Sequence, residues 1–91
     1  MFRLWGKIWT KNHLIKDTVI CDNRKDVNRT RKIYGAIDEI CNQFDLSRPL
    51  WLDSNIEEFK RHDKTRFRKD NFIDDIEFDF LEIQVIEEDE E

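Results

Sequence analysis

The segment Asp26–Phe44, with the sequence DVNRTRKIYGAIDEICNQF, carries the most regular hydrophobic pattern of the chain and decides the fold class. Its apolar residues recur at steps of three and four positions, which is the spacing of a helix with one buried stripe. The stripe consists of Val27, Ile33, Tyr34, Ile37, Ile40, Cys41 and Phe44. A helix of this kind buries its stripe against a second layer, so the flanking segments are expected to supply a sheet.

The segment before this helix predicts a β-hairpin. Residues 2–9 alternate between two sides, with Phe2, Leu4, Gly6 and Ile8 on one and Arg3, Trp5, Lys7 and Trp9 on the other. This period of two indicates a strand with one apolar face. Residues 14–21 are rich in Ile, Val and Thr and predict a second strand, and Asn12 in the connecting turn tolerates a positive φ best. Lys16 and Asp17 interrupt the second strand, which indicates a bulge, an edge position or partial cover.

The segment after the long helix predicts a short strand and a short helix. Pro49 ends the helical run, and residues 50–52 are expected to form a third, minor strand. Ser54–Glu57 matches a capping box, in which the serine hydroxyl accepts from the amide three residues on. This predicts a helix that begins at Ser54, turns Ile56 and Phe59 inward and ends near His62.

Residues 76–86 predict the last strand, after a basic loop and a single turn at 71–74. Its apolar residues change side in the middle, from Ile76, Phe78 and Phe80 to Leu81, Ile83 and Val85. Either a bulge near Phe80-Leu81 brings both sets to the core, or the strand is central and covered on both sides. The expected element order is ββαβαβ. The fold class is α+β, with a mainly antiparallel sheet of three to four strands packed on one long and one short helix.

The charges of this 91-residue chain are strongly segregated. Residues 1–69 hold sixteen bases and ten acids, a balance of +6, whereas residues 70–91 hold eleven acids and no base, so the two parts sum to −5. The length suits one domain, predicted at 1–86, followed by an acidic tail at 87–91. The segregation favours electrostatic association, either within the fold or with a charged partner.

No secretion signal and no stretch of about 20 apolar residues is found, so a cytoplasmic protein without a membrane segment is expected. Cys21 and Cys41 are then predicted to be reduced core residues. The sequence has no glycine-rich phosphate loop and no CxxC, HExxH or GxSxG motif. His13 and His62 are expected at the surface, and a cysteine nucleophile paired with His62 is the alternative. We expect no enzymatic activity, no metal and no cofactor.

A basic segment at residues 60–69 is the strongest candidate for anion binding. Its members Lys60, Arg61, Lys64, Arg66, Phe67, Arg68 and Lys69 could grip phosphates and stack a base. The competing interpretation, a solvated loop neutralised by the acids that follow, is favoured because the chain is acidic overall. A second basic cluster surrounds the start of the long helix, where the helix dipole disfavours bases: Arg24, Lys25, Arg29, Arg31 and Lys32. We expect acids of the last strand or the tail to screen one of these clusters.

Trp5 and Trp9 share one side of the first strand with Arg3 and Lys7. Either a helix covers this side, or two tryptophans and two bases are exposed together. Cover is favoured because large aromatic residues are mostly buried. If exposed, these four residues form a candidate protein-binding site, since Trp and Arg are enriched among residues that dominate binding energy.

Three stretches, RLWGKI at Arg3–Ile8, WLDSNIEEFKRH at Trp51–His62 and FLEIQVIEED at Phe80–Asp89, resemble a family of short uncharacterised bacterial proteins. The resemblance implies a stand-alone cytoplasmic protein and brings no activity, ligand or site residue with it. The sequence therefore predicts a non-enzymatic interaction or regulatory protein that binds a protein partner or self-associates. An accessory nucleic-acid-binding protein that uses residues 60–69 is the alternative.

Overall fold

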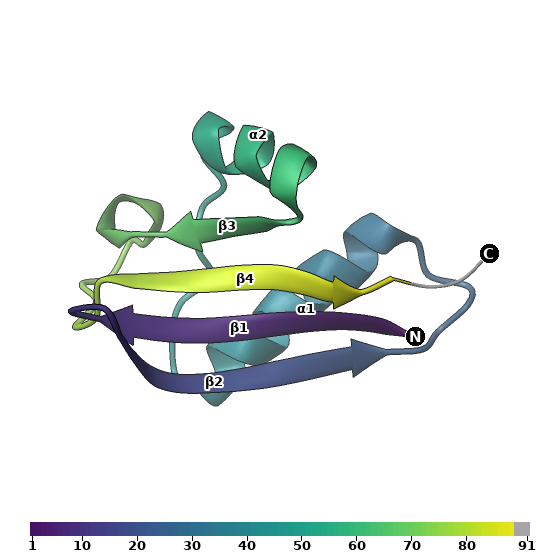
Figure 1. Ribbon diagram of the computed structural model, residues 1–91, viewed down its shortest axis with the longest axis horizontal. Coiled ribbons are helices and arrows are strands. Elements are labelled where there is room, and N and C mark those ends of the chain that lie inside the picture. Colours follow the sequence, from purple (N-terminus) through teal and green to yellow (C-terminus); the bar gives the residue numbers. More distant parts are fainter. Residues whose placement is uncertain (89–91) are drawn as a thin grey trace.

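The computed structural model describes residues 1–88, which form a four-stranded antiparallel sheet and two helices. In chain order the elements are β1 (Phe2–Thr10), β2 (His13–Asp22), α1 (Arg29–Gln43), α2 (Asp53–His62), β3 (Lys64–Phe67), the short 3-10 helix η1 (Lys69–Asn71) and β4 (Phe80–Glu87). The strands lie side by side in the order β2-β1-β4-β3 (Figure 1). The α+β class and the mainly antiparallel sheet predicted from the sequence are confirmed.

β1 and β2 form the hairpin that the alternating pattern predicts. Lys11 and Asn12 have φ angles of 50° and 64°, and Thr10 pairs with His13 across this two-residue turn. The register shifts near the start of β2, where Ile15 has no residue opposite it. β2 is also an outer strand of the sheet, so both the bulge and the edge position predicted for it are confirmed.

α1 packs its apolar stripe against the inner side of β1. Asn28 caps the helix, because its side-chain oxygen accepts a hydrogen bond from the Arg31 amide at 2.9 Å. The helix approaches the sheet closely at Gly6, where an added Cβ would lie 2.8 Å from Ile40 Cδ1. A larger residue at position 6 would therefore force the Ile40 side chain to shift. Tyr34, which the periodicity places in the buried stripe, is instead 46% exposed.

The third strand lies elsewhere than the sequence predicts. Residues 50–52 do not join the sheet, and β3 instead arises within the basic segment that is predicted to be a loop. The observed order is therefore ββααββ, apart from η1. β3 is only four residues long and two of them are exposed bases, so its own sequence gives little indication of a strand.

Two buried side-chain amides hold this part of the fold together. Asn55 donates to Thr65 Oγ1 and to the Arg66 carbonyl, both at 2.9 Å, and Asn71 donates to the Leu50 carbonyl at 2.7 Å. Asn55 also accepts from the Leu52 amide at 3.1 Å, so α2 begins at Asp53. The predicted capping box at Ser54–Glu57 is wrong, because the residue that reaches back to the helix start is Asn55.

β4 begins at Phe80, and the bulge predicted near Phe80-Leu81 is absent. Ile76 and Phe78 precede the strand and pack against the core from a loop. The register of β4 with β1 shifts at Ile86 instead, where Ile86 has no residue opposite it. Leu81 and Ile83 are fully buried between the sheet and the helices.

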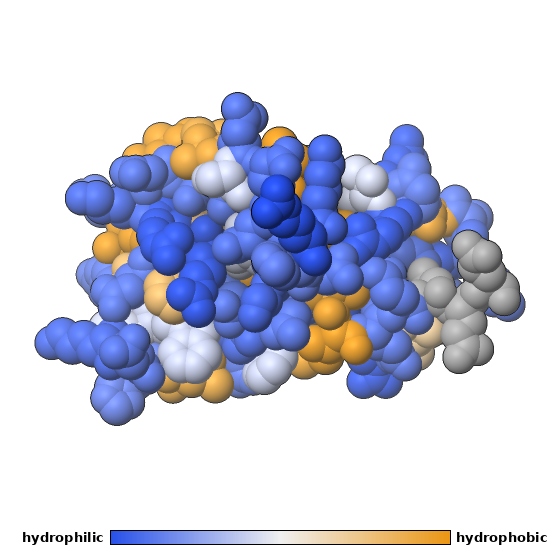
Figure 2. Space-filling model, turned by 45° about the horizontal axis from the view of Figure 1, so that its top comes forward, coloured by the Kyte–Doolittle hydropathy of each residue, from blue (hydrophilic) through white to orange (hydrophobic). Residues whose placement is uncertain are grey.

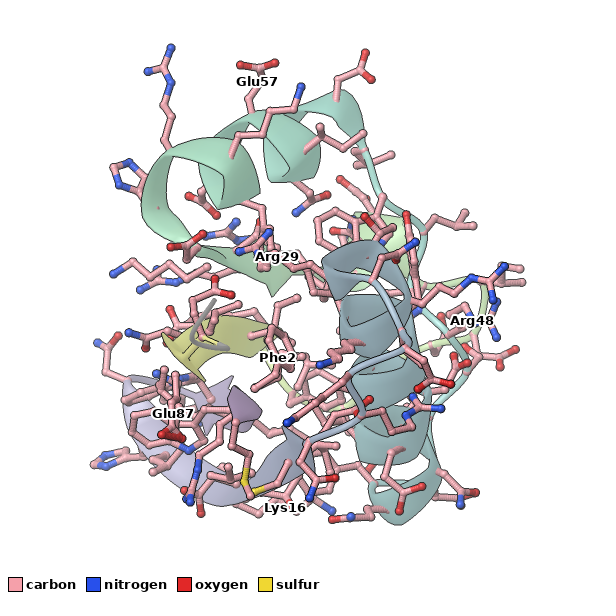
Figure 3. The ribbon with its side chains drawn as sticks, turned by 90° about the vertical axis from the view of Figure 1, so that its right-hand side faces the viewer. Phe2, Lys16, Arg29, Arg48, Glu57 and Glu87 are labelled. Atoms are coloured by element: carbon pink, nitrogen blue, oxygen red, sulfur yellow. The ribbon has the colours of Figure 1, made fainter. Side chains whose placement is uncertain are left out.

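α1 packs on one side of the sheet, whereas α2 lies along the β3 edge (Figure 1, Figure 3). α1 contacts β1 and β2, whereas α2 contacts β3 on the side that carries Thr65 and Phe67. Figure 3 shows the sheet and α1 as two layers, with Phe2 between them and α2 above. Trp51 fills the space below α2, with ring centroids 5.4 Å from Phe59 and 5.2 Å from Phe67. No helix of residues 1–88 packs over the side opposite α1, which we call the open sheet face.

Candidate functional site

The open sheet face collects alternate residues of all four strands. Its members are Arg3, Trp5, Lys7 and Trp9 of β1, Leu14, Asp17, Val19 and Cys21 of β2, Lys64 and Arg66 of β3, and Phe80, Glu82 and Gln84 of β4. The predicted helical cover of Trp5 and Trp9 is therefore absent in residues 1–88. Both rings are nevertheless half-buried, because neighbouring side chains of the same face surround them.

A row of alternating charges crosses the open sheet face. The backbone pairing places Asp17, Lys7, Glu82 and Arg66 opposite one another on four successive strands. Lys7 Nζ lies 2.9 Å from Glu82 Oε1, and Arg66 Nε lies 2.9 Å from Glu82 Oε2. The side chains of Lys7 and Glu82 are both only 8% exposed. Burial alone raises the pKa of Glu82, but the hydrogen bonds from Lys7 and Arg66 outweigh it and lower this pKa overall.

Aromatic rings and cations pack together beside this row. The Trp9 and Phe80 rings stack with their centroids 6.3 Å apart. The guanidinium groups of Arg66 and Arg68 lie 4.5 Å and 5.6 Å from the centre of the Phe80 ring. Such cation–π contacts hold long basic side chains in place on a surface.

Trp5 is held in a similar way at the other end of the face. Its indole nitrogen donates to Asp17 Oδ2 at 2.8 Å, and Lys7 Nζ lies 3.9 Å from the ring centre. Lys7 also donates to Gln84 Oε1 at 3.0 Å. Together these contacts fix the orientation of the indole, so the aromatic part of the open sheet face is ordered before any partner binds.

The structure separates the predicted anion-binding residues from one another. Lys64 and Arg66 are on the open sheet face, Arg68 lies beside Phe80, Lys60 and Arg61 belong to the last turn of α2, and Lys69 begins η1. Phe67 is fully buried in the core, so the prediction that its ring could stack a base is wrong. The aromatic residue that contacts these cations is Phe80, which the sequence places in the apolar set of the last strand.

Acids near the C-terminus pair with one base of each basic cluster, Glu88 with Arg29 and Glu82 with Arg66. Arg29 binds Glu88 at 2.9 Å and Asp63 at 2.9 Å, and Arg3 binds Glu87 at 2.7 Å. Residues 89–91 of the predicted acidic tail lie outside the described residues. Asp22 supplies a further internal partner, since its bond to Arg24 lowers the pKa of Asp22 to about 2.

The cysteines and histidines lie apart from the open sheet face, except for Cys21 at its margin. Cys41 is buried, and burial raises the pKa of its thiol to about 11. Cys21 is exposed on the outer strand, so its assignment to the core is wrong. His13 and His62 are both exposed, as predicted. Within residues 1–88, no three His, Cys, Asp or Glu side chains are grouped so that they could hold a metal ion.

Two hollows are lined in part by bases of the segment 60–69. One, of about 290 Å³, lies beside β3 and is lined by Glu58, Lys64, Thr65, Arg66, Arg68 and Glu82. The other, of about 200 Å³, separates α1 from α2 and is lined mainly by aromatic and aliphatic residues. Figure 2 shows that the surface on the α2 and β3 side is mostly hydrophilic, with hydrophobic residues in separate groups.

Comparisons with protein-family models, curated proteins and solved structures find no match for this chain. The resemblance to a bacterial family therefore stays a prediction. None of the helices in residues 1–88 has the length and apolar character needed to cross a membrane.

Proposed function

We propose that this protein is a non-enzymatic interaction protein that docks through its open sheet face onto a partner protein with an acidic surface. The observation that carries the proposal is the convergence of Trp5, Trp9 and Phe80 with Arg66 and Arg68 on a sheet face without a helix. The cytoplasmic location expected from the sequence belongs to the same proposal.

The aromatic residues supply the binding energy in this proposal. Tryptophan and arginine dominate the energetics of protein interfaces because they bury large areas and also form hydrogen bonds. Trp5 and Trp9 are already held by Asp17, Lys7 and Phe80, so little side-chain entropy remains to be lost on binding.

The charges select the kind of partner. Lys7, Arg66 and Arg3 have carboxylate partners within the chain, whereas Lys64 and Arg68 have none among the described residues. Both line the hollow beside β3, together with Arg66. A carboxylate of a partner protein placed between Lys64 and Arg68 would complete this side of the face, and complementary charge of this kind favours specificity and fast association.

Nucleic-acid binding is the second candidate, because Lys64, Arg66 and Arg68 also suit phosphate groups. It ranks lower for two reasons. Arg66 is already bonded to Glu82, and the Phe80 ring that could stack a base is contacted by two guanidinium groups and by Trp9. Stacking needs a free ring face.

Two double variants, each of which replaces two bases by glutamate, test the proposal. The variant Lys64→Glu/Arg68→Glu changes the open sheet face, and Lys60→Glu/Arg61→Glu makes the same change in net charge on α2. We expect the unmodified protein to capture a partner from nuclease-treated native lysate, and purified partner to bind the first variant at least about tenfold more weakly than the second.

Three results would contradict the proposal. They are equal loss of binding in both variants, loss of capture after nuclease treatment, and salt-sensitive retention of the protein on single-stranded DNA that the first variant abolishes. The last result would establish the nucleic-acid function instead. Circular dichroism of both variants shows whether each retains its fold.

A further inference from the structure

We propose that β2 is a dimerisation edge, at which a second copy of this chain adds its own β2 in antiparallel orientation. This inference does not depend on the docking function of the open sheet face, because it uses the backbone of the outer strand. The result is one continuous eight-stranded sheet made from two four-stranded sheets.

The two edges of the sheet differ in how they are covered. Among the described residues β2 pairs only with β1, so its outward N–H and C=O groups are left for another strand over a length of ten residues. The opposite edge, β3, is four residues long, and Asn55 bonds the Arg66 carbonyl there at 2.9 Å. Unpaired strand edges are templates for association.

The presence of one accessible edge limits the assembly to a dimer. If both edges were open, copies would join one after another and form a fibre. With β2 as the accessible edge, two copies join β2 to β2 about a two-fold axis, and the edges that remain are the two short β3 edges beside α2. The chain therefore favours a closed pair.

The sequence of β2 selects the register. A two-fold axis perpendicular to the sheet places one residue opposite itself, and residues from the same side of the sheet then face each other. If the axis passes at Asp17, the Asp17 carboxylates of the two copies face each other, which is unfavourable. If it passes at Thr18, Lys16 of one copy faces Ile20 of the other, and no ion pair forms. If the axis passes at Val19, Lys16 of each copy faces Asp22 of the other, so the contact occurs twice. All of residues 16–22 are then paired.

The Val19 register also fits the structure of the strand. The segment 16–22 begins just after the bulge at Ile15, so its pairing with β1 is regular throughout. Val19 is 40% exposed, and each copy would cover the Val19 side chain of the other. The two open sheet faces would then lie on the same side of one sheet, which makes the dimer a bivalent binder.

Cysteine cross-linking tests the register. In a Cys21→Ser background, Val19→Cys places two thiols directly opposite each other, at the separation of facing residues, and oxidation should join the two chains. Thr18→Cys is the matched control, since Thr18 faces Ile20 of the second copy and its thiols point to the helix side. We expect rapid cross-linking of the first variant and little of the second.

Charge exchange tests the interface in solution. Sedimentation of the full chain should show a monomer–dimer equilibrium. Lys16→Glu should shift it toward monomer by about tenfold in dissociation constant, because the new carboxylate then lies opposite the carboxylate of Asp22. Adding Asp22→Lys to this variant, together with Arg24→Gln to remove the guanidinium that bonds residue 22 within each chain, restores opposite charges and should restore the dimer. Circular dichroism shows that each variant is folded.

Two outcomes would overturn the inference. One is a monomer at all concentrations up to about 1 mM, where even weak pairing is detected. The other is a dimer in which Val19→Cys does not cross-link or in which Asp22→Lys with Arg24→Gln fails to rescue Lys16→Glu. Either outcome leaves the docking proposal intact, because that proposal is tested by residues of β3 and its neighbour Arg68.

Discussion

Removal of the Glu82 carboxylate tests the energetics of the open sheet face most directly. In the native protein the Lys7 side chain is 8% exposed, and Glu82→Leu would leave it with Gln84 Oε1, 3.0 Å away in the native protein, as its side-chain acceptor. Breaking a buried ion pair costs about 3–5 kcal/mol, and the retained bond to Gln84 favours the lower end, about 3 kcal/mol. For a domain of this size, that corresponds to a fall in melting temperature of about 12–24 °C.

The matched control lies between the same two strands. Arg3 and Glu87 also form a β1–β4 ion pair, at 2.7 Å, but both side chains are 46% exposed. Exposed pairs contribute about 0–1 kcal/mol, so Arg3→Met should lower the free energy of unfolding by less than about 1 kcal/mol. The double variant Lys7→Met/Glu82→Leu removes both buried charges and should recover most of the loss seen in Glu82→Leu.

Urea denaturation followed by tryptophan fluorescence measures all four proteins. If Glu82→Leu is no more destabilised than Arg3→Met, then Lys7 and Glu82 are solvated in solution and the reasoning is wrong. If the double variant is as unstable as Glu82→Leu, the loss comes from packing and not from an uncompensated charge.

Three further predictions follow from individual residues. Gly6→Ala should destabilise the fold by about 1–3 kcal/mol because its methyl group meets α1, whereas Gly35→Ala, where an added Cβ meets nothing within 4 Å, should stabilise α1 by about 0.5–1 kcal/mol; thermal melts compare the two. Asp22 has a pKa lowered from 3.8 to about 2, so its contribution to stability is present above about pH 4 and is lost as the pH falls toward 2. The urea midpoint should therefore change less with pH in Asp22→Asn than in the unmodified protein between about pH 4 and pH 2. An equal change in both proteins would contradict this assignment. A thiol reagent at neutral pH should modify Cys21 in the native protein and Cys41 only after unfolding; equal rates would show that Cys41 is accessible.

The parts of the fold that local patterns determine could be predicted from the sequence. α1 and the β1–β2 hairpin follow from periodicities that extend over many residues, and the bulge in β2 follows from Lys16 and Asp17. β3 could not be predicted, because it depends on pairing with β4 and on bonds from Asn55, a residue ten positions away from Thr65. The exposure of Cys21 likewise depends on which strand is outermost.

The candidate site could be predicted only in pieces. Alternation in β1 places Arg3, Trp5, Lys7 and Trp9 on one side, but whether a helix covers that side depends on where both helices dock. The role of Phe80 depends on the start of β4 and on its register with β1. Two patches far apart in sequence become one surface only after the strand order is set, and no local pattern contains that information.

The charge row also bears on how the sheet finds its alignment during folding. A slip of β4 along β1 by two residues keeps every inward-pointing residue inward, so hydrophobic burial alone does not reject it. Such a slip would set Glu82 opposite a tryptophan and break the ion pair between Lys7 and Glu82. The ion pair between Lys7 and Glu82 therefore selects the register of β4 on β1. It stabilises one alignment among several that bury the same apolar residues.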